Sequence, residues 1–333
     1  MSAIVTITLN PSIDKHVVVP ELVPGHKLRC SQPLLQPGGG GINVARATKR
    51  LGGDATAIYL AAGSNGAKLT RMLEEEGIRT RVIVTEGDTR ENLMVVEQSS
   101  GLQYRFIFPG PAVSPSVRED LASILETECE GSFVVVSGSL PPGLPASVFG
   151  QLASIARNKK CKLVIDTSGE ALKKALETGV YLLKASVREL YSLAGIEGQE
   201  TEEQEANAIP RMAALANQLI IDNHCHAVVV SMGAAGALLV TEKGTRRMET
   251  PSVKAVSTIG AGDSMLAGIV LKLSLGEDLE KAVEYGCACG AASTLNEGTT
   301  LCSPRDVEQL YAQMHDNRQP RRDQIPGTAY TIL

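Results

Sequence analysis

The chain has 333 residues, enough to bury a substantial core as one large domain or as one domain with an appendage. Its 32 lysine and arginine residues are outnumbered by 37 acidic residues, and the net charge of -5 argues against a general nucleic-acid-binding surface. The positive charge that matters for function must therefore be local.

Targeting and cysteine usage point to the same compartment. No apolar run reaches the ~20 residues of a membrane-spanning helix, and no signal peptide is visible before the first strand-like segment. The 7 cysteines, an odd number without a Cys-x-x-Cys pair, fit reduced thiols better than disulfides. We expect a cytoplasmic protein that binds neither nucleic acid nor membranes.

Strand-like runs alternate with helix-like stretches along most of the chain. Short β-forming runs occur at residues 4–9, 55–60, 133–136, 163–165, 181–183 and 228–231. This alternation is typical of an α/β fold with a doubly wound, mostly parallel sheet. Ligands of such sheets bind beyond the carboxyl ends of the strands, and the glycine motifs described below fall there.

Two segments of the chain read as pure β structure. Residues 15–35 and residues 89–108 have this character, and Ser99-Ser100-Gly101 turns a hairpin within the second. We expect these segments to form a small β-sheet lid inserted in the main domain.

The second lid segment carries aromatic side chains with a period of two. Tyr104, Phe106 and Phe108 would share one face of a strand, and Arg105 would lie on the other face. The aromatic side chains would then be buried or meet a partner lid, while Arg105 could turn toward the cleft.

Four consecutive glycines, Gly38 to Gly41, lie after the first lid segment and precede Asn43 and a helix-like run. Glycines are costly in backbone entropy, so this cluster predicts a place where a ligand lies against the main chain. Asn43 would point a neutral amide at that ligand. The alternative is a flexible turn.

His224-Cys225-His226 and Cys287-Ala288-Cys289 are two short patterns to which we assign no chemistry. The first lacks a metal-ligand spacing and predicts a loop before the next strand. The second lies in an apolar helix-like run and predicts small core side chains.

The segment Thr258 to Ser264 carries the strongest functional signal, because it places Asp263 at the start of a helix. Leu266, Ile269, Val270 and Leu273 follow with the spacing of one buried helical face. Small residues and the positive end of the helix dipole favour an anion here, and an ionised Asp263 could accept a proton from a substrate hydroxyl. The alternative is an ordinary N-cap.

Two common nucleotide-binding folds lose support. The chain contains neither the Gly-x-x-x-x-Gly-Lys-Ser/Thr of a P-loop nor the Gly-x-Gly-x-x-Gly of a dinucleotide fold. From Asp316 the sequence becomes polar without a core pattern, so we expect a domain over residues 1–315 and a solvated tail over residues 316–333.

Five motifs in this order identify a family. They are Asn10-Pro11-Ser12-Ile13-Asp14, Gly38 to Asn43, Ser137-Gly138-Ser139-Leu140-Pro141-Pro142-Gly143, Asp166-Thr167-Ser168-Gly169 and Gly260 to Asp263. Through them the chain, over about residues 4–312, resembles the ribokinase-like (PfkB) sugar kinases and, within these, the phosphofructokinases. The resemblance implies ATP-dependent transfer of a phosphoryl group to O1 of fructose 6-phosphate, a step of glycolysis that gives fructose 1,6-bisphosphate.

Other activities stay open beside this one. Within the family, the alternatives are phosphorylation of fructose 1-phosphate at O6 or phosphorylation of tagatose 6-phosphate. Outside enzymes, the alternative is a non-catalytic sensor of sugar phosphates or nucleotides that kept the fold. Asp263 favours an enzyme, because a sensor needs no base beside an anion site.

The resemblance also implies roles for particular residues. Asp263 would be the general base, and the amides of Gly260, Ala261 and Gly262 would hold the transferring phosphoryl group. The sugar and its phosphate would be bound by Asp14, Gly38, Gly39, Asn43, Ser139, Arg90, Arg105, Lys27 and Arg29. Relatives form dimers through interlocking lids, so a homodimer is expected, with Lys27 or Arg29 acting across its boundary.

The nucleotide side follows from the same resemblance. ATP would lie against Ser231, Gly233, Gly236, Lys184 and Thr258, with Mg²⁺ bridging its phosphates. A monovalent cation such as K⁺ would bind mainly to carbonyl groups at Ser257, Ile259, Ser293, Asn296, Gly298 and Thr300.

One stretch departs from the family pattern. The family has Asn-x-x-Glu after the lysine of the strand that precedes the nucleotide region, and here Glu189 keeps its place while Ser186 replaces Asn and Ala185 replaces Pro. A hydroxyl is shorter than an amide, so this departure predicts weaker contact with magnesium-ATP.

Overall fold

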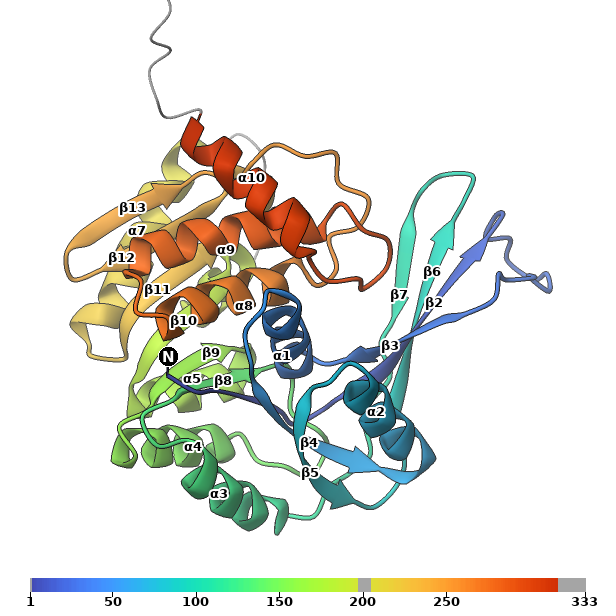
Figure 1. Ribbon diagram of the computed structural model, residues 1–333, viewed down its shortest axis with the longest axis horizontal. Helices are drawn as coiled ribbons and strands as arrows, with labels where there is room; N and C mark the ends of the chain where they lie inside the picture. Colours follow the sequence, from blue (N-terminus) through green and yellow to red (C-terminus); the bar gives the residue numbers. More distant parts are fainter. Residues whose placement is uncertain (1, 197–204, 317–333) are drawn as a thin grey trace, which may run out of the picture.

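The main domain of the computed structural model is built on a nine-stranded sheet, and the structure describes residues 2–196 and 205–316 (Figure 1). The strand order is β13-β12-β11-β10-β9-β8-β1-β4-β5. The strands are β1 (Ile4–Thr8), β4 (Thr56–Ala62), β5 (Arg79–Thr85), β8 (Phe133–Ser137), β9 (Lys162–Asp166), β10 (Val180–Ser186), β11 (Cys225–Ser231), β12 (Ala237–Thr241) and β13 (Gly244–Met248). From β11 to β5 all neighbours are parallel, whereas β12 and β13 are antiparallel additions at one edge.

Two helical layers bury the two faces of this sheet. One face is covered by α1 (Gly40–Arg50), α2 (Gly63–Glu75), α8 (Ala261–Ser274), α9 (Leu279–Ser293) and α10 (Pro304–Asp316). The other is covered by α3 (Val117–Glu128), α4 (Ser147–Asn158), α5 (Gly169–Thr178), α6 (Val187–Leu193) and α7 (Glu205–Ile221). Each helical layer forms a core with its face of the sheet. In β1, Ile4 packs in the core beneath α1 and α8, whereas Val5 and Ile7 pack in the core on the opposite face, as the two-residue period of a strand requires.

The lid is a separate four-stranded sheet in the order β3-β2-β6-β7, and Figure 1 shows it projecting from one side of the main domain. Its strands are β2 (Ser12–Val19), β3 (Leu34–Gly38), β6 (Arg90–Glu97) and β7 (Gln103–Phe106). Strand β2 pairs in parallel with β6, so the two lid segments join edge to edge in one sheet. The predicted doubly wound fold with a β lid is confirmed.

The structure corrects several details of the sequence interpretation. Residues 15–35 are not continuous β structure, because β2 ends at Val19 and β3 begins at Leu34. Prolines at positions 20, 24 and 33, which cannot donate to a sheet, occupy this interval. Cys225 and His226 begin β11 rather than lying in a loop.

Other expectations concern single side chains and the ends of the chain. All 7 cysteines carry free thiols, and Cys287 and Cys289 are buried in the core as predicted. No helix in residues 2–196 or 205–316 is long and apolar enough to cross a bilayer. The predicted tail lies outside the described residues except for Asp316, which ends α10.

Candidate active site

The carboxyl ends of the parallel strands gather polar side chains at one edge of the sheet. Ser137 ends β8, Asp166 ends β9, Ser186 ends β10 and Ser231 ends β11. Because neighbouring parallel strands end at the same edge, these residues meet there, as in other open α/β sheets.

The start of α8 places Asp263 at this edge. Gly260 precedes the helix with φ of 77°, a left-handed conformation that favours glycine, and no side chain of the described residues caps the helix. Asp263 lies in the first turn, and its Oδ2 accepts a hydrogen bond of 2.9 Å from Asn43 Nδ2. The N-cap alternative for Asp263 is therefore wrong, because Gly260 holds that position.

Burial, followed by charged neighbours, sets the protonation of Asp263. Burial raises its pKa to about 7, the charges of Asp166 and Asp14 add to the rise, and the Asn43 hydrogen bond and Lys184 oppose it. A carboxyl with this pKa is poised to accept a proton near neutral pH.

Lys184 is a buried cation beside the start of α8. Its Nζ lies 3.0 Å from Asp166 Oδ1, with 8% and 11% of the two side chains exposed. Burial alone would lower the pKa of Lys184, but the charges of Asp166, Asp263 and Glu189 hold it above its usual value. A Cβ atom at Gly262 would lie 2.8 Å from Nζ, so glycine is needed for Lys184 to approach this turn.

The four-glycine cluster lies against protein atoms. A Cβ at Gly38 would lie 2.5 Å from the Asp14 carboxyl group, and a Cβ at Gly41 would lie 2.5 Å from the carbonyl oxygen of Ile7. Gly40 is packed as closely against the hydroxyl of Ser137. Gly38 thus lets β3 lie against β2, and Gly40 and Gly41 let α1 lie against β8 and β1. This close packing is a different reason for their presence from the predicted contact with a ligand, and the flexible-turn alternative is wrong.

Asp14 is held on the lid side of the edge. It lies in β2, and its Oδ1 accepts hydrogen bonds from Ser12 Oγ at 2.7 Å and from Asn92 Nδ2 at 2.9 Å. Asn10 Nδ2 donates to Ser139 Oγ at 3.0 Å, which fixes the other polar side chain predicted to meet the sugar.

The four predicted lid cations differ in their contacts. Arg90 already donates to three backbone carbonyls, those of Asn10 at 2.8 Å, Phe108 at 3.0 Å and Pro11 at 3.4 Å. Arg105 lines a small cavity of about 30 Å³ together with Asp14. Arg90 thus ties the lid to the loop after β1, whereas Arg105 faces the cleft.

Lys27 and Arg29 are exposed on the loop between β2 and β3. Figure 1 shows this loop at the end of the lid that points away from the main domain. The structure therefore does not bring these two cations together with Asp263 in one chain, and their action across a subunit boundary stays a prediction.

A second cavity of about 360 Å³ lies beside the first turns of α8. It is lined by the predicted nucleotide residues Ser231, Gly233, Gly236 and Thr258. Ala261 and Gly262 of the anion site also face it, and Val253 and Met265 give it an apolar wall. Its size and apolar wall suit a base and sugar.

Ser186 and Glu189 do not line this cavity. Ser186 is the N-cap of α6, and its Oγ accepts from the backbone N–H of Glu189 at 3.3 Å. Glu189 Oε2 in turn accepts from Ser186 N at 2.7 Å and from Ser186 Oγ at 2.8 Å. The two side chains form a capping box, a local role that the sequence interpretation did not give them.

The residues predicted to hold a monovalent cation lie in two loops and at the last residue of α9. Ser257 N–H donates to the Thr294 carbonyl at 3.2 Å, and Ser257 Oγ donates to the Gly298 carbonyl at 3.0 Å. Ser293 Oγ is buried and has no hydrogen-bond partner among the described residues. No group of three or more His, Cys, Asp or Glu side chains suited to a metal ion occurs in the described part of the chain.

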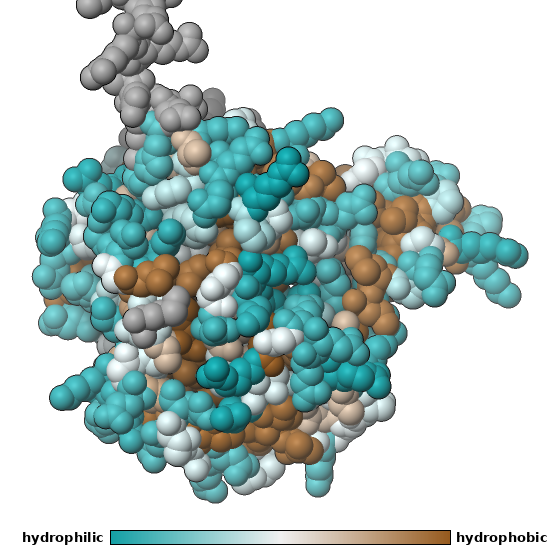
Figure 2. Space-filling view, viewed as in Figure 1, coloured by the Kyte–Doolittle hydropathy of each residue, from teal (hydrophilic) through white to brown (hydrophobic). Residues whose placement is uncertain are grey.

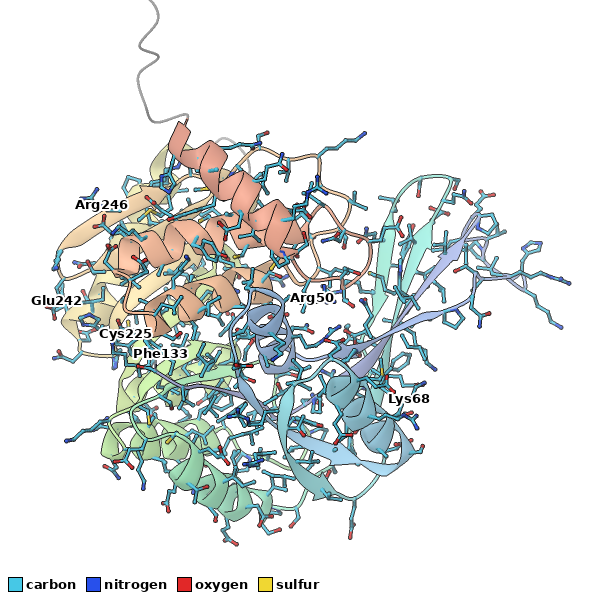
Figure 3. All side chains as sticks on the ribbon, in the orientation of Figure 1. Arg50, Lys68, Phe133, Cys225, Glu242 and Arg246 are labelled. Carbon is cyan, nitrogen blue, oxygen red and sulfur yellow. The ribbon has the colours of Figure 1, made fainter. Side chains whose placement is uncertain are left out.

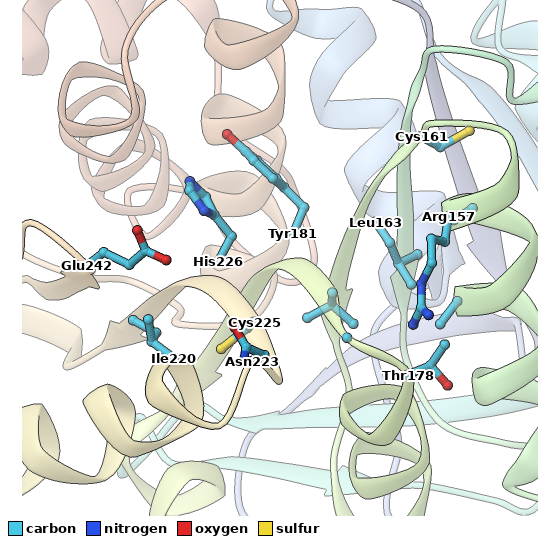
Figure 4. A pocket seen from close by; sticks show the side chains of 14 residues that line it. Arg157, Cys161, Leu163, Thr178, Tyr181, Ile220, Asn223, Cys225, His226 and Glu242 are labelled. Carbon is cyan, nitrogen blue, oxygen red and sulfur yellow. The ribbon is translucent and has the colours of Figure 1, made fainter.

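A further cavity of about 480 Å³ lies at the amino ends of β9, β10 and β11, the opposite edge of the sheet (Figure 4). Arg157, Tyr181, His226 and Glu242 line it. It contains none of the predicted site residues, and the buried charges of Lys184, Asp166 and Asp263 gather at the carboxyl edge instead.

Sequence reasoning missed three side chains of the site. Asn92 holds Asp14, Asp166 pairs with Lys184, and Arg46 donates to Asn43. Asp166 was visible as part of a motif, and Arg46 follows Asn43 by three residues, a spacing that places both on one side of a helix. For Asn92 no local pattern gave a signal.

Comparison with known proteins agrees with this geometry. Residues 4–306 match the model of the pfkB family of carbohydrate kinases. The chain belongs to this family. It is 40% identical over 316 residues to the ATP-dependent 6-phosphofructokinase isozyme 2 of Escherichia coli K12, covering 94% of this chain and 99% of that one.

Two further comparisons concern another sugar phosphate and the fold. The 1-phosphofructokinase of Bacillus subtilis is 33% identical over 318 residues, covering 95% of this chain and 99% of that one. The crystal structure of phosphofructokinase-2 from E. coli in complex with potassium matches with a TM-score of 0.88 and 39% identity over 95% of this chain and 100% of that one. The predicted membership of the PfkB kinases and their phosphofructokinase branch is confirmed.

Proposed function

We propose that this chain is an ATP-dependent 6-phosphofructokinase that transfers the γ-phosphoryl group of ATP to O1 of fructose 6-phosphate. The observation that carries the proposal is the position of Asp263, held by Asn43 between the nucleotide-sized cavity and the lid residues Asp14 and Arg105. The choice of sugar phosphate is supported by the higher identity to the 6-phosphofructokinase than to the 1-phosphofructokinase.

Phosphoryl transfer depends mainly on positioning and charge stabilisation. Asp263 takes the proton of the acceptor hydroxyl, while the backbone N–H groups at the start of α8 and the Lys184 ammonium stabilise the charge of the transferring group. The Ala261 N–H also donates weakly to the Thr258 carbonyl, at 3.4 Å, and would exchange that bond for the phosphoryl oxygen.

The phosphate of the acceptor lies at the far end of the sugar from the reacting hydroxyl. Arg105 of the same chain, Arg90, and Lys27 or Arg29 from the lid of a second subunit supply its positive surroundings. Asp14, Asn43, Ser139 and the main chain at Gly38 and Gly39 orient the sugar.

Two cations belong to the proposal. The free carboxylate oxygens near the nucleotide cavity are few, because Asp166 pairs with Lys184 and Glu189 is part of a capping box. This donor set fits Mg²⁺ held mainly by nucleotide phosphates and water, where it neutralises phosphate charge. The hydroxyl of Ser293, which has no hydrogen-bond partner in the described part of the chain, and the carbonyl-rich loops around Ser257 fit a monovalent cation such as K⁺, with Ile259, Asn296, Gly298 and Thr300 beside it.

A homodimer through the lid completes the proposal. Leu34, Phe106, Ile107 and Phe108 on the lid are between 47% and 57% exposed, and Figure 2 shows hydrophobic surface there. Such a patch on a projecting sheet is typical of a protein interface. We place the enzyme in the cytoplasm, in agreement with its free thiols.

A coupled assay with magnesium-ATP and a panel of hexose monophosphates tests the substrate. We expect the highest kcat/KM with fructose 6-phosphate. A higher value with fructose 1-phosphate or tagatose 6-phosphate would reassign the substrate within the family. Saturable binding of a sugar phosphate without any turnover would favour the sensor alternative.

A further inference from the structure

Arg46 of α1 is a buried cation that the proposed reaction does not use directly. Its side chain is 2% exposed, and a charge so deeply buried requires partners. It donates from Nε to Glu76 Oε2 at 2.8 Å and from Nη2 to Glu76 Oε1 at 2.7 Å, a bidentate ion pair. Its Nη1 donates to the Pro37 carbonyl at 3.0 Å and to Asn43 Oδ1 at 3.4 Å.

These contacts form a continuous row from the surface to the catalytic base. Glu76, at the end of α2, is 32% exposed on its side chain. Arg46 joins it to Asn43, which is 6% exposed, and Asn43 Nδ2 donates to Asp263 Oδ2 at 2.9 Å. Three helices, α2, α1 and α8, are therefore connected through side chains that converge on Asp263.

Because arginine can only donate hydrogen bonds, Arg46 determines the orientation of the Asn43 amide. An asparagine amide can present either its oxygen or its nitrogen to a neighbour, whereas a guanidinium group can only donate. Arg46 therefore holds the amide oxygen of Asn43 on its own side and leaves the amide nitrogen for Asp263. We propose that Arg46, anchored by Glu76, is a positioning residue that fixes the Asn43 amide so that it orients the catalytic base.

This inference rests on the proposed role of Asp263 as the base. Without Arg46 the Asn43 amide could rotate, and Asp263 would lose its fixed donor while the nucleotide site kept its own contacts. The effect should therefore appear in kcat and, because Asn43 also orients the sugar, in the KM for the sugar phosphate, whereas the KM for magnesium-ATP should stay nearly unchanged. Misplacement of a catalytic group by ~1 Å costs on the order of 10²-fold, so we expect kcat to fall by roughly 10- to 100-fold.

A second readout follows from the groups that face Asp263. These are Asp166 from β9, Lys184 from β10, Asp14 from β2 and Asn43 from α1. Of these, the Asn43 hydrogen bond and Lys184 lower the pKa of Asp263. Loss of a fixed Asn43 donor should therefore move the acid limb of the kcat profile to higher pH, an effect that a general loss of stability would not produce.

The experiment compares Arg46→Met, Asn43→Ala and the double variant, with Arg50→Met as a matched control. Arg50 lies one turn further along α1 (Figure 3), is partly buried, donates to the Leu301 carbonyl at 3.1 Å and makes no hydrogen bond to Asn43. Both arginine variants should lower the melting temperature, but only Arg46→Met should lower kcat. The double variant should be no slower than Asn43→Ala within about twofold, because both changes remove the same interaction.

If Arg46→Met does not fold, Arg46→Lys and Glu76→Gln test the same positioning role with milder changes. Lysine retains a donor without the bidentate geometry, and glutamine weakens the anchor, so each should lower kcat less than Asn43→Ala and shift the acid limb in the same direction. If the losses in kcat multiply in the double variant, or if the acid limb is unshifted in the Arg46 and Glu76 variants, the role of Arg46 is wrong. Either result would leave the proposed function standing. A wild-type protein without turnover on any hexose phosphate would instead overturn the proposed function, and the inference with it.

Discussion

The two halves of the cleft differ in how completely their side chains are held. In the catalytic half, Asp263, Asn43, Lys184 and Asp166 have partners within 3.0 Å. In the lid half, Asp14 and Arg90 also have hydrogen-bond partners, but no hydrogen bond or ion pair to Arg105 occurs in residues 2–196 and 205–316. In the proposed enzyme, the groups for phosphoryl transfer would thus be held within one chain, whereas binding of the substrate phosphate would be completed by the substrate itself and by the proposed second subunit.

The largest expected effect tests the catalytic half. Asp263→Asn keeps the shape of the side chain but cannot accept a proton, so kcat should fall by roughly 10²-fold or more while sugar-phosphate binding is kept. Steady-state kinetics and direct binding of fructose 6-phosphate would measure this. A variant with more than about half of the wild-type kcat would remove Asp263 from its role as base.

The next effect tests the lid half. Arg105→Ala should raise the KM for the sugar phosphate by roughly 10- to 150-fold, because a hydrogen bond to a charged group contributes ~1.5–3 kcal/mol. Its melting temperature should be unchanged, since Arg105 is exposed.

Arg90→Ala is the matched comparison for Arg105→Ala. It should lower the melting temperature as well as raise the KM, because Arg90 holds three backbone carbonyls. Equal KM values for the wild type and both variants, with every hexose phosphate, would place both arginines outside the site.

A smaller effect concerns pH. Because the pKa of Asp263 is raised to about 7, kcat should decline below that pH, by about tenfold per unit once the base is mostly protonated. The folded state binds this proton more tightly than the unfolded state, so its stabilising contribution is present at low pH and is lost as pH rises through about 7. Asp263→Asn should thus raise the melting temperature relative to wild type more at pH 8 than at pH 5. A kcat that stays level from pH 8 to pH 5 would contradict the raised pKa.

The smallest effect sharpens the nucleotide side. Ser186→Asn should preserve the helix cap, because Asn is as good an N-cap as Ser, and should lower the KM for magnesium-ATP by the ~0.5–1.5 kcal/mol of one hydrogen bond. Ser186→Ala is the control and should lose ~0.5–2 kcal/mol of stability with the cap. A weaker affinity for ATP in Ser186→Asn would mean that the capping box leaves no room for the amide.

The sequence predicted the parts of the fold that have a local signature. The buried parallel strands were visible as apolar runs. The glycine segments at residues 38–41 and 260–262 predicted the helices that follow them. Strand β13 was missed because four of its five residues are exposed and polar or lack a side chain, and β5 because Arg79 and Arg81 in its first half leave only a short apolar run. Edge strands carry little of the hydrophobic pattern on which such predictions depend.

The site shows the same limit for contacts that are distant in sequence. Asp263 was predicted from its own helix, but its partner Asn43 lies 220 residues away, and no periodicity connects them. The capping box is the opposite case. Ser186-Val187-Arg188-Glu189 has the local Ser-x-x-Glu pattern, which the comparison with the family motif obscured.

The order of strands in the main sheet has a consequence for synthesis of the protein. Strand β1 lies between β4 and β8, and Ile4 is opposite Phe133. At ~5–20 residues per second, a ribosome adds β8 roughly 6–25 s after β1. Small domains fold in microseconds to seconds, which is shorter than this interval. The edge of the buried strand β1 that pairs with β8 therefore stays unpaired for longer than folding itself takes. During that interval the nascent chain presents an unpaired strand edge, the kind of surface that chaperones protect from aggregation.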